Sequence, residues 1–260
     1  MIRVYSWPTP NGHKVHIMLN ECELEHEIYP VDIAKGEQFE TDFLAISPNN
    51  RIPAIIDTDG PDGKPISVFE TAAILHYLAD KTGKFLPSSN SNPHGYYKVM
   101  EWVMWQMGGV GPMMGQSNHF RNYAPKKIPY AVERYVNEVI RLFGVADTRL
   151  GHSKYLGGND YSIADIACYP WMRGWKGQEV PIEDFPNVKR WMADIESRPA
   201  VKLGLNTLKD RRRSGPPKGK DLDIRIIGDD TLILNEISKE LKAFLRSKSL
   251  TFLSSILWRW

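Results

Sequence analysis

The sequence has little cysteine and no strong excess of charge of either sign. Its 260 residues include two cysteines, Cys22 and Cys168, and no C-x-x-C pair. We therefore expect neither a disulfide framework nor a structural zinc site. The histidines show no metal-ligand spacing either, so no metal is expected. The formal net charge is +2, which gives no general attraction to nucleic acid.

Long apolar segments are also missing. No run of about 18 apolar residues occurs, so we expect no transmembrane segment. Met1–Tyr5 has the β-branched and aromatic character of a strand, and no apolar signal region precedes it. Together with the low cysteine content, these features predict a cytoplasmic protein.

Residues 1–86 alternate short strand-like and helical patterns. A D-G-P-D-G loop at 59–63 separates the last two strands and predicts a hairpin. The order strand, helix, strand, helix, strand, strand, helix (βαβαββα) favours a small mixed sheet with helices on its faces. The expected strands are 2–6, 28–31, 52–57 and 66–69, and the expected helices lie near 15–22, 39–44 and 74–82.

From residue 93 to 208 the periodicity is helical throughout, which predicts an all-α second domain. Ser162 followed by Asp165 resembles a capping box at a helix start. The four expected helices are 96–107, 130–150, the one that begins at 162, and 188–197.

Residues 209–260 differ from both domains. They carry 12 Lys and Arg against 7 Asp and Glu, and they read as a basic linker followed by an atypical tail. Leu234, Ile237 and Leu241 have the spacing of an amphipathic helix. The basic run is most simply a solvated segment, and a targeting signal or an anionic partner is the alternative.

The string T-P-N-G at 9–12 follows the first strand and opens the first helix. A helix start carries unpaired N–H groups and the positive end of the helix dipole, which together stabilise a thiolate. This protein has no cysteine there. It offers the hydroxyl of Thr9 and the amide of Asn11, which could stabilise the thiolate of a bound small molecule. The alternative is an ordinary turn with an N-cap.

Two further elements have a binding interpretation and a structural one. Pro53, at the start of a strand after Asn49-Asn50, is either preceded by a cis bond that exposes backbone to a peptide ligand or is a plain edge-strand proline. Glu70 and the N–H of Thr71, at a helix start, can hold the ammonium and carboxylate of one ligand. Ordinary helix capping is the alternative.

These elements, in this order and spacing, resemble the glutathione site of the cytosolic glutathione transferases. That resemblance implies a thioredoxin-like N-terminal domain on an all-helical C-terminal domain, assembled as a homodimer. The chain is most similar to the Nu-class branch, the glutathione-dependent disulfide-bond oxidoreductases, and the resemblance covers roughly residues 1–208. Its marks are T-P-N-G at 9–12, S-P-N-N-R-I-P-A-I at 47–55, W-Q-M-G-G-V-G-P-M at 105–113, I-P-Y-A-V-E-R-Y at 128–135 and S-I-A-D at 162–165.

The resemblance implies a role for each site residue in binding glutathione as a cosubstrate. Thr9 and Asn11 would face its sulfur, and Gln38 would hold its glycyl end. Neither cysteine has a position in this site, and both are expected to be buried apolar residues.

The remaining implied contacts lie along the rest of the tripeptide. Ile52, through its backbone, would pair with the cysteinyl unit before a cis Pro53. Glu70 and Thr71 would bind the γ-glutamyl end, where the family usually has serine at the position of Thr71. Arg134 would reach across a dimer to the ligand of the partner.

The sequence therefore predicts an enzyme that reduces disulfides with glutathione. A transferase that joins glutathione to hydrophobic electrophiles is the first alternative, and a non-catalytic glutathione-binding regulatory protein is the second. A stripe of methionine and tryptophan could line a substrate cavity, although such stripes more often form plain core. It comprises Trp102, Met104, Trp105, Met107, Met113 and Met114.

Overall fold

The computed structural model describes residues 1–211, which belong to a unit that extends from Met1 to Pro216. Its first seven elements have the predicted order; most boundaries shift by one to three residues, and the first helix begins five residues earlier than predicted. A short 3₁₀ turn at Glu37–Phe39 is added before the second helix. The elements are β1 (Ile2–Ser6), α1 (Pro10–Glu21), β2 (His26–Pro30), α2 (Thr41–Ile46), β3 (Ala54–Asp57), β4 (Ile66–Phe69) and α3 (Thr71–Thr82).

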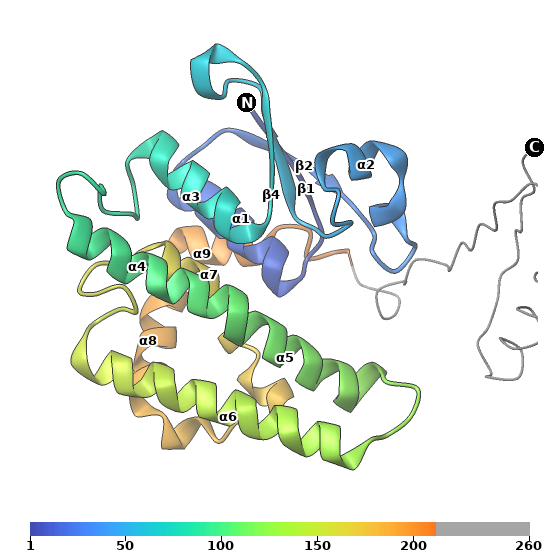
Figure 1. Ribbon diagram of the computed structural model, residues 1–260, viewed down its shortest axis with the longest axis vertical. Coiled ribbons are helices and arrows are strands. Elements are labelled where there is room, and N and C mark those ends of the chain that lie inside the picture. Colours follow the sequence, from blue (N-terminus) through green and yellow to red (C-terminus); the bar gives the residue numbers. More distant parts are fainter. Residues whose placement is uncertain (212–260) are drawn as a thin grey trace, which may run out of the picture. The chain divides into compact units, whose positions relative to one another are not determined.

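The four strands form one sheet in the order β2-β1-β3-β4. The β1–β2 pair is parallel, and the β1–β3 and β3–β4 pairs are antiparallel. Because side chains alternate along a strand, Ile2 and Val4 enter the core shared with α1 and α3, whereas Tyr5 packs with Phe43 of α2 on the opposite face. This arrangement confirms the predicted thioredoxin-like domain (Figure 1).

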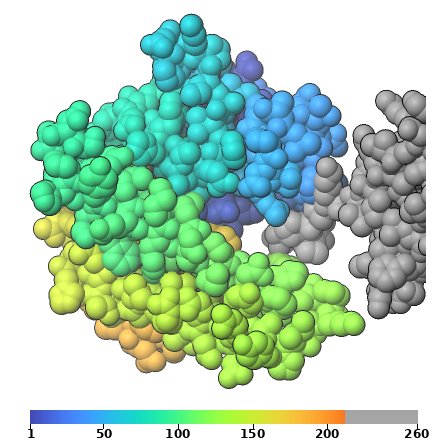
Figure 2. Space-filling view, in the orientation of Figure 1, coloured from blue at the N-terminus to red at the C-terminus, as the bar shows by residue number. Residues whose placement is uncertain are grey.

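The second half is helical, as predicted, and it lies directly against the first domain (Figures 1 and 2). Two short helices, α5 and α9, were absent from the sequence prediction. The first has the glycine-rich sequence G-P-M-M-G-Q-S-N and the second begins directly at Pro199 after another helix ends. The helices are α4 (Pro93–Trp105), α5 (Gly111–Asn118), α6 (Pro129–His152), α7 (Ile163–Met172), α8 (Pro186–Ser197) and α9 (Pro199–Asn206).

The start of α7 is fixed by the predicted capping box. The fully buried Asp165 carboxylate accepts hydrogen bonds from the Ser162 backbone and hydroxyl at 3.0 Å, from the Leu156 amide at 2.9 Å and from Trp191 Nε1 at 2.9 Å. One carboxylate thus joins the loop before α7 to α8, and it gives α7 a fixed position beside α1.

Helix α9 packs closely on α1 because Gly204 has no side chain. A Cβ atom at this position would lie 2.7 Å from the backbone N and Cα of Ile17. The carbonyl of Gly204 also accepts a hydrogen bond from His13 Nδ1 at 3.3 Å, which requires the Nδ1–H tautomer. The contacts of Gly204 therefore fix the position of α9 against α1.

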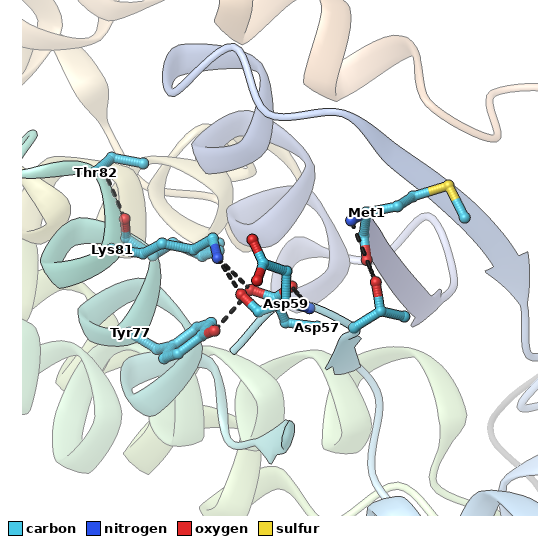
Figure 3. Close-up of polar contacts among 8 residues, drawn as sticks. Met1, Asp57, Asp59, Tyr77, Lys81 and Thr82 are labelled. Carbon is cyan, nitrogen blue, oxygen red and sulfur yellow. Dashed lines mark hydrogen bonds and ion pairs between the residues drawn. The ribbon is translucent and has the colours of Figure 1, made fainter. Parts of the chain in front are cut away.

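A buried carboxylate attaches α3 to the sheet (Figure 3). Asp57, at the end of β3, is 1% exposed. It accepts hydrogen bonds from Tyr77 Oη at 2.6 Å and the Asp59 amide at 3.0 Å, and its Oδ2 lies 3.0 Å from Lys81 Nζ. Burial raises the pKa of Asp57, but the contacts from Tyr77, Asp59 and Lys81 outweigh it and hold that pKa below its usual value.

None of the described helices is both long and apolar enough to cross a bilayer. The predicted boundary at 86–93 falls between α3 and α4, and as a domain boundary it stays a prediction. The predicted amphipathic segment near 234–241 and most of the basic tail lie outside the described residues.

Asp57→Asn should lower the free energy of unfolding near pH 7 by about 1–3 kcal/mol, because the buried donors lose a charged acceptor. A folded-state pKa below the usual value gives stability that is present at neutral pH and is lost as the pH falls through that pKa. The difference between variant and wild type should therefore shrink below about pH 4. Urea unfolding across pH measures it, with the exposed Asp160→Asn as control, and a pH-independent difference contradicts the assignment.

Candidate functional site

A cavity of about 290 Å³ lies where the first domain meets the helical domain. Five of the eight predicted site residues line it, namely Asn11, Ile52, Pro53, Glu70 and Thr71. The first domain also contributes Lys14, Asn49, Arg51 and Phe69, and the helical domain contributes Gln106, Met107, Gly111, Pro112 and Trp171.

The other three predicted residues do not line this cavity. Thr9 lies at the N-cap of α1, where its hydroxyl oxygen accepts a hydrogen bond from the Gly12 amide at 3.2 Å. Gln38 is buried in the 3₁₀ turn. Arg134 is exposed on α6. The structure of one chain thus brings together the Asn11, Ile52–Pro53 and Glu70–Thr71 elements, and it leaves Thr9, Gln38 and Arg134 outside.

The orientation of the Asn11 amide is fixed by Trp171, which comes from α7 of the helical domain. Trp171 Nε1 donates a hydrogen bond to Asn11 Oδ1 at 2.8 Å. An indole N–H can only donate, so the asparagine oxygen must face it. The Nδ2 group of Asn11 is then the polar end that remains for the cavity, and it is a donor.

The backbone at the start of α1 adds to this donor. Pro10 has no N–H, and the Gly12 N–H is taken by Thr9. Among the described residues this leaves the Asn11 N–H as the uncapped amide of the first turn, at the positive end of the helix dipole. Asn11 therefore offers the cavity both a side-chain and a backbone donor.

The loop before β3 and the start of α3 form the opposite wall. The Ile52–Pro53 peptide bond is cis, and Glu70 has a left-handed φ of 69°. Asn49 Nδ2 donates to Glu70 Oε1 at 3.2 Å. Among the described residues, no side chain caps α3, so the amides of its first turn, which begins at the cavity-lining Thr71, are uncapped. This geometry differs from the ordinary N-cap that was the alternative interpretation of Glu70 and Thr71.

The sequence interpretation missed Lys14, which lies one turn after Asn11. Its side chain is 1% exposed, and Nζ donates to Gln106 Oε1 at 2.6 Å and to Thr71 Oγ1 at 3.2 Å. Gln106 is buried in a π-helical turn, Gln106–Val110, between α4 and α5. The signal was present in the sequence as a lysine on the apolar face of the first helix and as the Gln of the W-Q-M-G-G-V-G-P string.

No thiol of the protein reaches the cavity. Cys22 and Cys168 are buried, as predicted, and neither lines the cavity. Burial raises the pKa of both thiols, that of Cys168 well above its usual range. Any thiol chemistry in this cavity must therefore use the sulfur of a ligand.

The methionine and tryptophan stripe divides among core, cavity and exposed surface. Met114 is buried in the core and Met104 is 53% exposed. Met107 lines the cavity, where its sulfur accepts a hydrogen bond from Thr71 Oγ1 at 3.4 Å. Trp102 and Trp105 pack against the core.

Comparison with protein-family models gives two matches. Residues 9–81 match the glutathione S-transferase N-terminal domain, and residues 111–199 match the glutathione S-transferase C-terminal domain. The first match contains the T-P-N-G, proline and Glu-Thr elements, and the second contains Trp171.

Several known proteins are similar to this chain over most of its length. The disulfide-bond oxidoreductase YfcG of Escherichia coli is 50% identical over 206 residues, which cover 79% of this chain and 94% of that protein. A glutathione transferase from Burkholderia graminis with two glutathione molecules per subunit has a TM-score of 0.76 and 47% identity, and the match covers 80% and 88% of the two chains. A glutathione transferase from Pseudomonas putida with one glutathione disulfide per subunit has a TM-score of 0.74 and 42% identity over 78% and 90%.

Proposed function

The chain belongs to the glutathione S-transferase family, and from that premise we propose that it is a glutathione-dependent disulfide-bond oxidoreductase. Within the family, this activity is favoured over conjugation because the Escherichia coli relative with 50% identity is named a disulfide-bond oxidoreductase. The Pseudomonas putida structure supports it as well, because glutathione disulfide is both a disulfide and the oxidised product of glutathione.

The observation that carries the proposal is the Asn11 amide, turned by Trp171 so that its donor end serves the cavity at the start of α1. A thiolate needs hydrogen-bond donors and positive potential. The helix start supplies the potential, and Asn11 supplies the donors. Since the protein brings no thiol of its own to this place, the stabilised sulfur is that of bound glutathione.

The tripeptide extends from this sulfur position along the wall formed by β3 and α3. In the proposed complex the backbone of Ile52 pairs with the cysteinyl unit, and Glu70 holds the γ-glutamyl ammonium. Thr71 and the uncapped start of α3 hold the carboxylate. Gln38 is assigned to the glycyl end and the hydroxyl of Thr9 to the sulfur, although neither residue lines the cavity itself.

The reaction proceeds in two exchange steps. The glutathione thiolate attacks one sulfur of a disulfide, so that a new S–S bond forms while the old one breaks and the departing thiolate takes up a proton. A second glutathione then attacks the mixed disulfide, which releases the second thiol and glutathione disulfide. Two glutathione molecules thus supply both electrons, and the protein contributes thiolate stabilisation and alignment.

We also propose that the protein acts as a cytoplasmic homodimer in which Arg134 reaches the ligand of the partner subunit. Large apolar side chains are exposed on β4 and α4, where Phe69 is 37%, Tyr97 64% and Met104 53% exposed. A large exposed apolar surface is a feature of protein interfaces, and these side chains are the ones assigned to it here.

Asn11→Asp should lower disulfide turnover about 100-fold, because it keeps the acceptor for Trp171 but replaces the amide donor with a negative charge beside the thiolate. Affinity for S-methylglutathione should change much less, since that ligand carries no thiolate. Steady-state rates and calorimetry measure the two effects. Asn90→Asp, on an exposed loop, is the matched control, and undiminished turnover in Asn11→Asp removes the assigned role.

Hydroxyethyl disulfide and an aryl halide separate the proposed function from conjugation. With reduced glutathione, the protein should turn over the disulfide at least about tenfold faster than the aryl halide, because exchange needs only an aligned thiolate, whereas conjugation also needs a site that activates a carbon electrophile. Strong aryl conjugation without disulfide reduction identifies the conjugating transferase instead. Glutathione binding with neither turnover identifies the regulatory alternative.

Met104→Lys should convert the proposed dimer to monomer in sedimentation analysis, because it places a charge on an apolar interface. Leu203→Lys is the matched control, since Leu203 is 60% exposed on α9, away from β4 and α4. A wild-type protein that sediments as a monomer contradicts both the dimer and the role of Arg134.

A further inference from the structure

Lys14 is a buried cation without a buried anion beside it. Its ammonium group has three N–H donors, and two of them go to neutral oxygens, those of Gln106 at 2.6 Å and Thr71 at 3.2 Å. No ion pair to Lys14 is found within residues 1–211. Because Lys14 lines the cavity, its third donor is available to a ligand.

The elements packed against α1 do not supply the missing counter-charge. At the N-cap of α3, the Glu70 carboxylate acts on Lys14 only through space and accepts a hydrogen bond from Asn49. From α7, Asp165 is engaged in its own cap, and burial raises the pKa of the Cys168 thiol so far that it is neutral. The only charged residue of α9 is the exposed Lys202.

Within α1 itself, the neighbouring histidines are also uncharged near neutral pH. Burial lowers the pKa of His13 to about 4 and that of His16 to about 3. The same effect acts on the lysine, since burial lowers the pKa of Lys14 to about 7, while the charge of Glu70 opposes the shift. The cavity is therefore lined by a lysine whose ammonium group has a pKa well below its usual value.

We propose that Lys14 binds the α-carboxylate of the γ-glutamyl end of glutathione. Its ammonium group supplies a positive charge beside that carboxylate, whereas Thr71 offers only neutral donors. The inference rests on the proposed glutathione site and deepens it. Glu70 directly precedes Thr71 in the chain, Lys14 donates to the Thr71 hydroxyl, and this carboxylate and this ammonium both belong to residues that line the same cavity. This pair is complementary to a zwitterionic α-amino acid group.

The network around Lys14 also explains the W-Q-M-G-G-V-G-P string of the helical domain. Gln106 orients the ammonium from the helical side, and a Cβ atom at Gly111 would lie 2.7 Å from Gln106 Nε2. Gly111 therefore leaves room for the glutamine that holds Lys14. Because Lys14 joins this turn to Thr71, the two domains contribute jointly to one carboxylate subsite.

Binding of this carboxylate should also change the protonation of Lys14. A carboxylate placed beside Lys14 favours its charged form, so the ligand should bind together with a proton wherever free Lys14 is partly neutral. With a pKa of about 7 in the free protein, binding at about pH 7.5 should take up more than half a proton. The uptake should disappear at about pH 5, where Lys14 is already charged.

The test uses S-methylglutathione, whose blocked sulfur releases no proton, in calorimetry with buffers of different ionisation enthalpy. A second ligand replaces the γ-glutamyl unit with 4-aminobutyrate, which keeps the amine and lacks the α-carboxylate. Wild type should take up the proton with the first ligand and not with the second. This comparison needs no variant, so it stands even where a substitution at this buried position disturbs folding.

Lys14→Met adds a test of position. It should weaken S-methylglutathione binding about tenfold or more, abolish the proton uptake and leave binding of the 4-aminobutyrate analogue within about twofold. Lys98→Met, on the exposed face of α4, should change nothing.

The possible failures are distinguishable. Binding of S-methylglutathione without proton uptake, or equal weakening of both ligands by Lys14→Met, overturns the role of Lys14 and leaves the glutathione site standing. Absence of any S-methylglutathione binding to wild type overturns the proposed function, and the inference with it.

Discussion

One hydrogen bond, from Trp171 to Asn11, determines what the cavity can do. It joins residues 160 positions apart, and it decides which end of an asparagine amide the cavity receives. A carboxamide is a donor at one end and an acceptor at the other, so the opposite orientation would present an oxygen and repel a sulfur anion. The thioredoxin-like domain supplies the start of α1 with Asn11. The helical domain supplies Trp171, which determines which end of the Asn11 amide faces the cavity.

In the proposed reaction the site uses thiol chemistry although both cysteines of the described chain are buried. Their thiols have raised pKa values because they are buried, and a thiol is oxidised through its thiolate. The reactive sulfur belongs to an exchangeable small molecule instead. The protein is therefore not itself consumed or trapped in a mixed disulfide, and its own residues provide only donors, charge and shape.

The sequence predicts features that depend on local pattern and misses those that depend on contacts across domains. The βαβαββα order, the Ser162–Asp165 cap and the buried cysteines follow from periodicity and residue type. Lys14, Gln106 and Trp171 gain their significance only because α1, the π-helical turn and α7 meet at one cavity. Helix α5 escaped prediction because its glycines have low intrinsic helix propensity, and tertiary packing rather than local preference holds it.

The close approach of α9 to α1 has a wider implication. A Cβ atom at position 204 would lie 2.7 Å from the backbone of Ile17. Ile17 belongs to α1, and the first turn of α1 contains Asn11. Even a single methyl group at position 204 would have to displace one of the two helices. Replacement of Gly204 would therefore push α9 and α1 apart and shift Asn11. It would impair the stabilisation of the ligand thiolate without removing any residue that lines the cavity.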